Sequence, residues 1–215
     1  LYSSAASDVY KRQVQLQQGQ HGEAETTYQT LLELYPGDPQ SYILLADFYS
    51  KIDQPIQAIE TLQSGIDLGL LDPGMFELLG RLHLAEGNIN EAERVTQTGL
   101  EIMPGAVGLH TLVGNILSRE IFDLSDQIQL ANANLWWYQY LIDRIQSNFA
   151  PRNAIQQRAL DARINGLRLE LQNQTNILEN AQRQLGNSQT NYETAQQAYL
   201  TALATVSYTH LRAHE

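Results

Sequence analysis

The side chains best able to do chemistry in this chain are its histidines and its neighbouring carboxylates. His83 and His110 each lack a second histidine one helical turn away, which a helix-borne metal site would need. Carboxylate pairs such as Glu91 and Glu93 fall on a solvated helix face. Cysteine is absent, and the glycines form no phosphate-binding loop. We therefore interpret the histidines as packing residues and predict no catalytic, cofactor or metal residues, hence no enzyme.

Composition favours a protein or peptide as the partner. The chain has 24 acidic and 13 basic side chains and a net charge of −11. Such a surface repels phosphate backbones, so nucleic acid is not an expected partner. No apolar run approaches the ~20 residues that a membrane helix needs, so no membrane segment is expected within the chain.

Both ends of the chain carry a pattern that belongs to DNA rather than to protein. Codons for Asp8–Gln13 can be chosen as the reverse complement of codons for Val206–Leu211. These strings resemble the translated arms of a transposase-based sequencing-library adapter. We interpret residues 1–13 and 206–215 as adapter-derived, and the rest as an internal, metagenomic fragment of a longer protein. A helix drawn over residues 7–18 would then be native only from Val14 onward.

An internal repeat of 34 residues determines which positions can carry binding residues. Ala24, Ala58 and Ala92 are spaced by 34 residues. Pro36 and Pro104 lie twelve residues after the first and third of them. Other positions recur in the same register, with aromatic or large apolar residues beside small ones. They are Gly19, Tyr28 and Leu31 in the first unit, Tyr42, Leu45, Ala46, Tyr49, Leu62 and Gly65 in the second, and Phe76, Leu79, Gly80, His83, Gly87, Thr96 and Gly99 in the third.

This pattern resembles the tetratricopeptide repeat, a helix–turn–helix unit of 34 residues. The resemblance implies an all-α solenoid of about three repeats plus a partial one, because a single unit cannot bury its own apolar face. It also implies a groove for a peptide or a partner helix along the first helices. By position, that groove would present Ile43, Asp47, Ser50, Lys51, Glu77, Arg81, Leu84, Thr111, Asn115, Ser118 and Arg119. The carboxylate clamp of one subtype is missing, since Asp47, Glu77 and Thr111 occupy its positions.

A fourth unit begins at His110, Val113, Gly114 and Leu117 and then departs from the repeat. Ser125 is expected to N-cap a new, longer helix. Apolar residues at alternating spacings of three and four indicate a coiled-coil seam in that helix, with Trp136 and Trp137 widening the buried stripe. The alternative for the two tryptophans is an exposed aromatic patch that binds a partner. A break is expected at Ala150-Pro151. The seam positions are Ile128, Ala131, Leu135, Tyr138, Ile142, Ile145 and Phe149.

A second long helix is expected after Pro151. Its heptads pass through Gly186-Asn187-Ser188, which favours a continuous or merely kinked helix over a turn there. Small residues in one row suit an antiparallel pair or hairpin. One row is Ile164, Leu171, Leu178, Leu185, Tyr192 and Tyr199; the other is Leu160, Leu167, Gln174, Ala181, Ser188, Ala195 and Ala202.

These expectations divide the chain into repeats over residues 14–119 and coiled coil over 120–205. The leading functional hypothesis is a scaffold or adaptor that binds a protein or peptide, with a coiled-coil extension. One alternative is a structural rod or envelope hairpin with the repeats as a docking head, self-associating through residues 126–205. Another is the non-catalytic part of a larger enzyme. A bacterial cytoplasmic location is favoured over a periplasmic one.

Overall fold

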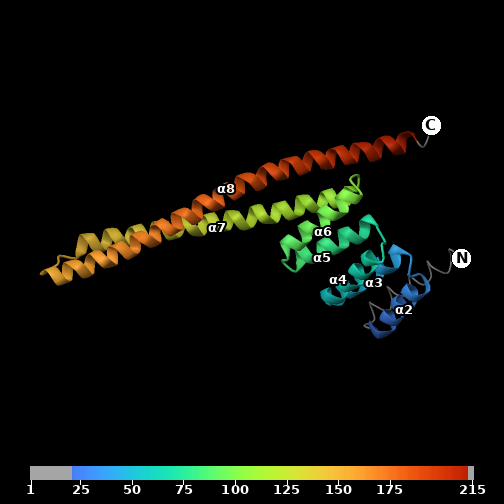
Figure 1. The fold of residues 1–215 in the computed structure, drawn as a ribbon, viewed down its shortest axis with the longest axis horizontal. Coiled ribbons are helices and arrows are strands. Elements are labelled where there is room, and N and C mark those ends of the chain that lie inside the picture. The colour runs from blue at the N-terminus through green and yellow to red at the C-terminus, as the bar shows by residue number, and fades with distance from the viewer. Residues whose placement is uncertain (1–20, 213–215) are drawn as a thin grey trace. The chain divides into compact units, whose positions relative to one another are not determined.

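The computed structural model describes the backbone of residues 21–212 and the side chains of residues 22–206. All regular structure among them is α-helical (Figure 1). The predictions for residues 1–13 and for a helix over residues 7–18 lie outside the described residues. The helices are α2 (His21–Leu34), α3 (Pro39–Lys51), α4 (Pro55–Asp67), α5 (Pro73–Ala85), α6 (Ile89–Ile102), α7 (Val107–Asn148) and α8 (Ala154–Arg212).

The chain forms two compact units, and each is described by itself. The first unit comprises residues 1–116 and 195–215, and the second comprises residues 117–194. Helices α7 and α8 each contribute to both units. In the first unit, α3, α5 and the start of α7 are the first helices of successive repeats, while α2, α4 and α6 are the second helices.

The turns before α3 and α5 use the same capping chemistry. The Asp38 carboxylate accepts a hydrogen bond from the Gln40 amide at 3.0 Å, and the Asp72 carboxylate accepts one from the Gly74 amide at 2.8 Å. Proline follows each aspartate, where its missing N–H costs nothing and its fixed φ suits a helix. The sequence motifs 36–39 and 72–74 therefore start α3 and α5, whereas α4 has already ended at Asp67.

The turns inside each repeat need a residue in the left-handed region. Gly87 has φ 76° between α5 and α6, and Asp53 has φ 60° at the equivalent place between α3 and α4. Asp is one of the few residues with a side chain that tolerates this conformation. The 34-residue period thus fixes backbone conformation as well as side-chain type.

Small residues allow close helix approach at repeated positions, as the sequence predicted. A Cβ on Gly65 would lie 2.9 Å from the Tyr42 ring, and one on Gly99 would lie 3.0 Å from the Phe76 Cβ. Gly65 and Gly99 are equivalent, and so are Tyr42 and Phe76. The second helix of each repeat therefore packs directly on the aromatic residue of its own first helix.

The crossing of α5 and α6 gives a test of this register. Ala92 is fully buried, and its carbonyl accepts a hydrogen bond from Thr96 Oγ1 at 2.7 Å. Ala92→Leu should therefore overfill the crossing and lower the free energy of unfolding by about 1–3 kcal/mol. Urea denaturation followed by circular dichroism measures the change. Ala85→Leu, at the exposed end of α5, serves as the control; equal denaturation midpoints for the two variants would contradict the register.

Helix α7 differs from the prediction at Ser125. The sequence suggested a new helix capped there, but α7 runs without interruption from Val107 to Asn148. No glycine or proline lies between Asn115 and Asn148, so nothing in this stretch stops the first helix of the fourth unit. The repeat pattern ends because its second helix is never formed, while the first helix simply continues.

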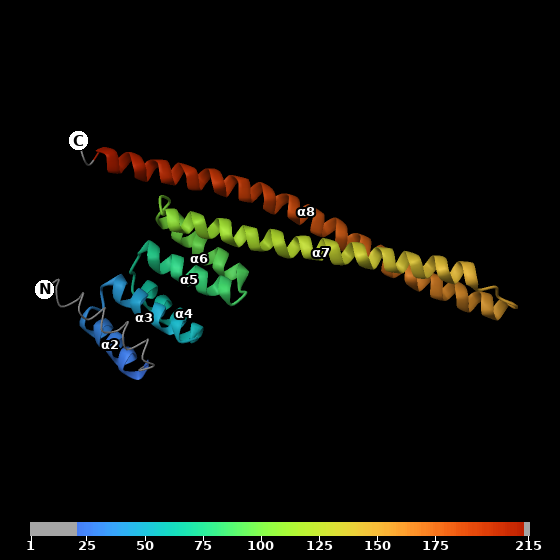
Figure 2. The ribbon, with the colours of Figure 1, turned by 180° about the vertical axis from the view of Figure 1, so that it is seen from behind.

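Within the second unit, α7 and α8 form an antiparallel hairpin with its break at residues 149–153, as predicted (Figure 2). Asn134 Nδ2 donates a hydrogen bond to Gln174 Oε1 at 3.2 Å across the pair. Both predicted rows of α8 are buried or half-buried, and α8 is continuous through Gly186, which confirms the heptad assignment. The seam expected to mediate association is thus used inside one chain, and self-association through residues 126–205 stays a prediction.

Three aromatic residues, two in α7 and one just after it, do not lie in the core where the sequence placed them. Trp136 and Trp137 were expected in the core, with an exposed aromatic patch as the alternative, and they are 68% and 49% exposed. Phe149 was assigned to the seam but is 51% exposed, since the helix ends at Asn148. The other predicted seam residues of α7 are buried or half-buried, which confirms that part of the pattern.

Candidate peptide-binding face

The predicted groove residues of α3 and α5 lie on neighbouring first helices, which contact each other. Asp47, Arg81 and Asn115 occupy equivalent positions on α3, α5 and α7. The residue before each is small: Ala46 and Gly80 are buried against the second helices, and Gly114 is half-buried. Each first helix therefore packs its small residue inward and presents the next side chain on another face. We call Asp47, Ser50, Arg81, Leu84 and Asn115 the first-helix face.

Two predicted groove residues also lie against the start of the next repeat. A Cβ on Gly74 of α5 would lie 3.2 Å from Ile43 Cδ1. At the equivalent place, a Cβ on Gly108 of α7 would collide with the carboxylate of Glu77. Ile43 and Glu77 therefore lie against the start of the next first helix. Sequence spacing alone could not show this, because it does not reveal which side of a helix the next repeat covers.

The charged side chains of α3 and α5 on this surface are paired along their own helices. Lys51 Nζ lies 2.5 Å from Asp47 Oδ2, and Arg81 Nη1 lies 3.5 Å from Glu77 Oε1. All four side chains are partly or well exposed, and exposed pairs of this kind contribute little stability. A binding segment can therefore exchange these partners at small cost. Ser50, Thr111 and Asn115 add exposed hydrogen-bonding groups.

Ser118 and Arg119 fall in the second unit and are therefore described apart from the other predicted groove residues. Arg119 Nε lies 3.6 Å from Asp123 Oδ1, one turn further along α7. These two residues are exposed on α7, but they are not counted in the first-helix face.

The histidines take the packing positions that the sequence indicated. His83 is half-buried on α5, and burial lowers its pKa below the ordinary value. His110 places its Nε2 2.8 Å from the Pro104 carbonyl oxygen, across the turn before α7. Within residues 22–206, no three histidine, aspartate or glutamate side chains gather as they would around a metal ion.

No helix in the described part is long and apolar enough to cross a membrane.

Charge is distributed unevenly between the two units, which the overall composition hides. Residues 21–116 carry fourteen acidic and three basic side chains, whereas residues 140–168, around the end of the hairpin, carry two acidic and five basic ones. The net charge of −11 for the whole chain does not reveal this basic segment. A count of charge by segment, placed on the predicted hairpin, is the signal that could have found it.

Comparison with known proteins agrees with the repeat pattern. Residues 15–82 match the family described as Tetratricopeptide repeat. Two similar solved structures are crystal structures of MamA, both 15% identical with a TM-score of 0.43. They cover 82% and 87% of this chain, and 96% of the MamA chain in each case. No curated protein matches the sequence.

Proposed function

We propose that this tetratricopeptide-repeat protein is an interaction scaffold that binds a peptide segment of a partner protein on its first-helix face. The row formed by Asp47, Arg81 and Asn115 carries the proposal. These residues repeat every 34 positions on adjacent first helices, while the small residues beside them are used in packing. Repeated polar side chains at a constant helix spacing suit an extended or helical segment that crosses several helices.

The charges on and around the face define what kind of segment would fit. The row itself holds one acidic, one basic and one amide side chain, so it favours a segment with matching polar groups in a fixed order. The repeats around it are strongly acidic, which disfavours a polyanion and favours a neutral or basic segment. Leu84 adds a half-buried apolar contact that one side chain of the segment could cover.

Panning of a phage-displayed library of random peptides on the full chain tests this proposal. The affinity of each recovered peptide is then measured for the unmodified chain and for its Arg81→Glu and Arg94→Glu variants. Both arginines are exposed and ion-paired to a glutamate of their own helix, but Arg94 lies on the second helix α6. We expect Arg81→Glu to weaken binding by about tenfold and Arg94→Glu to leave it nearly unchanged. Equal loss in both variants, or no selected peptide, would overturn the proposal.

A further inference from the structure

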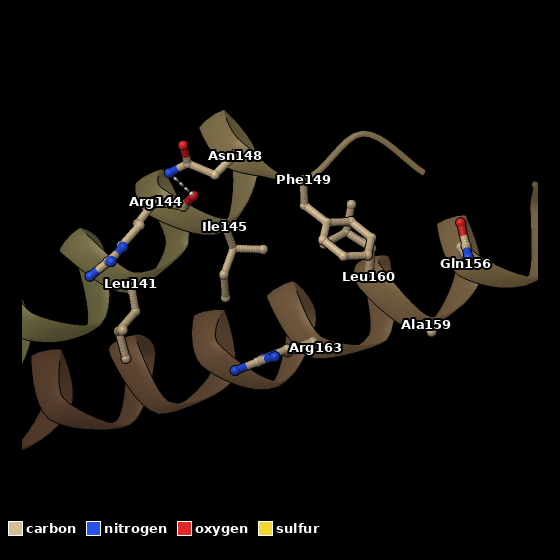
Figure 3. Close-up of a pocket in the computed structure, with 9 residues that line it drawn as sticks. All are labelled: Leu141, Arg144, Ile145, Asn148, Phe149, Gln156, Ala159, Leu160 and Arg163. Atoms are coloured by element: carbon tan, nitrogen blue, oxygen red, sulfur yellow. Dashed lines mark hydrogen bonds between the residues drawn. The ribbon is translucent and has the colours of Figure 1, made fainter. Parts of the chain in front are cut away.

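The end of the α7–α8 hairpin holds a groove that the first-helix face does not use. Its volume is about 670 Å³. Leu141 and Ile145 line it from α7, Phe149 lines it from the turn after α7, and Leu160 lines it from α8, while Arg144 and Arg163 stand at its sides. Figure 3 shows Leu141 and Ile145 pointing from α7 toward α8. All of these residues belong to the second unit. The groove therefore has an apolar floor between two helices and a guanidinium group from each helix.

The arginines around this groove differ from most basic residues elsewhere among the described side chains, of which only Arg183 also lacks an ion pair. Ion pairs in the described residues involve Lys51, Arg81, Arg94 and Arg119. None of them involves the arginines of the hairpin end, which are Arg144, Arg152, Arg158, Arg163 and Arg168. Arginines without acidic partners, in a segment where basic side chains outnumber acidic ones, present charge that is available to an anionic partner.

An aromatic row leads along α7 to the groove and orients one of these arginines. Trp136 and Trp137 stack with Tyr140, with ring centroids 5.6 and 5.8 Å apart. Arg144 lies 5.9 Å from the centroid of the Tyr140 ring, and its Nη1 donates a hydrogen bond to Tyr140 Oη at 3.1 Å. Tryptophan, tyrosine and arginine are the residue types that dominate binding energy at protein interfaces.

We infer that this groove binds an acidic amphipathic helix of a partner protein. Two packed helices leave a groove in which a third helix can lay an apolar stripe. Leucine or similar side chains one turn apart would cover Ile145, Phe149 and Leu160. Glutamate or aspartate beside that stripe would pair with Arg144 and Arg163. The positive charge at the hairpin end, in a chain that is acidic overall, selects such a helix against a basic one. Trp137, two turns before Arg144, would flank the same helix.

The two tryptophans of the chain supply the measurement, because both lie in the aromatic row beside the groove. The probe is a capped synthetic helix of about 18 residues, since shorter isolated helices are marginal. It has leucine at alternating spacings of three and four and glutamate at most other positions. Titration into the full chain should shift tryptophan emission in a saturable way. The same peptide with lysine in place of glutamate should give no shift.

Charge reversal locates the contact. The double variant Arg144→Glu/Arg163→Glu should weaken binding of the glutamate peptide by at least about tenfold. Arg183→Glu, at an exposed position of α8 away from the groove, should change it by less than about twofold. Equal weakening by both would show a general charge effect and overturn the inference. The inference would also be overturned if the glutamate peptide caused no emission shift in a chain whose circular dichroism shows that its helices are folded.

A lipid surface is the competing occupant, because tryptophan and arginine also gather at membrane interfaces. Vesicles of phosphatidylglycerol separate the two. If the inference holds, the vesicles cause no shift of tryptophan emission at lipid concentrations that would saturate a protein that binds anionic lipid. The glutamate peptide does cause a shift. A shift with vesicles that Arg144→Glu/Arg163→Glu abolishes, without any shift from the peptide, would assign the hairpin end to lipid instead.

Discussion

Phe48→Ala is expected to lower the free energy of unfolding by about 3–5 kcal/mol. Phe48 is 1% exposed and lies in the main apolar core of the repeats. Its ring centroid is 5.2 Å from that of Tyr28 on α2 and 5.5 Å from that of Tyr49. Truncation would remove the transfer free energy of the ring and leave a cavity between two repeats. It would also remove both aromatic contacts, so the cost should fall at the upper part of the range.

Urea denaturation followed by the circular dichroism of the helices measures this loss. Tyr35→Ala is the matched control, because Tyr35 is an aromatic residue exposed in the turn after α2. We expect it to change the free energy of unfolding by less than about 0.5 kcal/mol. A Phe48→Ala variant that unfolds together with the control would mean that α2 and α3 do not share a core.

Ile142→Ala is expected to destabilise the hairpin by about 2–5 kcal/mol. Ile142 is 4% exposed on the seam of α7. Counting along antiparallel helices from the Asn134–Gln174 hydrogen bond places it at the level of Ile164 and Leu167. A two-helix hairpin has a thin core, with few neighbours that could move to fill the space left by an isoleucine side chain.

Tryptophan fluorescence follows this loss directly, because both tryptophans of the chain lie on α7 in the hairpin. Leu169→Ala on α8 is the control: it is a truncation of similar size at a position that is 73% exposed. Its expected effect is below about 0.5 kcal/mol. If the two variants share one denaturation midpoint, the assigned seam is wrong.

The sequence predicted the repeats well because their determinants are local and periodic. Small residues at 58, 65, 80, 92 and 99 recur in register and are buried where helices pack, and both Asp-Pro pairs start a helix. The heptads of α8 also predicted a continuous helix through Gly186, since a seam is set by spacing within one helix. These features depend on neighbours within one or two turns.

Other predictions depended on contacts between distant residues, and there the sequence was insufficient. The sequence placed Ile43 and Glu77 in a binding groove, but each covers a glycine of the next first helix. The serine expected to cap a new helix at 125 lies inside α7, since capping residues are also tolerated within helices. Trp136 and Trp137 are apolar in type, yet the single partner helix leaves their side of α7 exposed.

The amino-acid sequence by itself thus determined the helices, their period and the seam of the hairpin, because each follows from spacing along the chain. Only the tertiary structure decided which faces of those helices remain uncovered. Burial depends on how many neighbours a helix has and on which side they lie. For that reason the structure, and not the sequence, separated the first-helix face from residues that join repeats. It also brought Arg144 and Arg163 together beside one apolar groove.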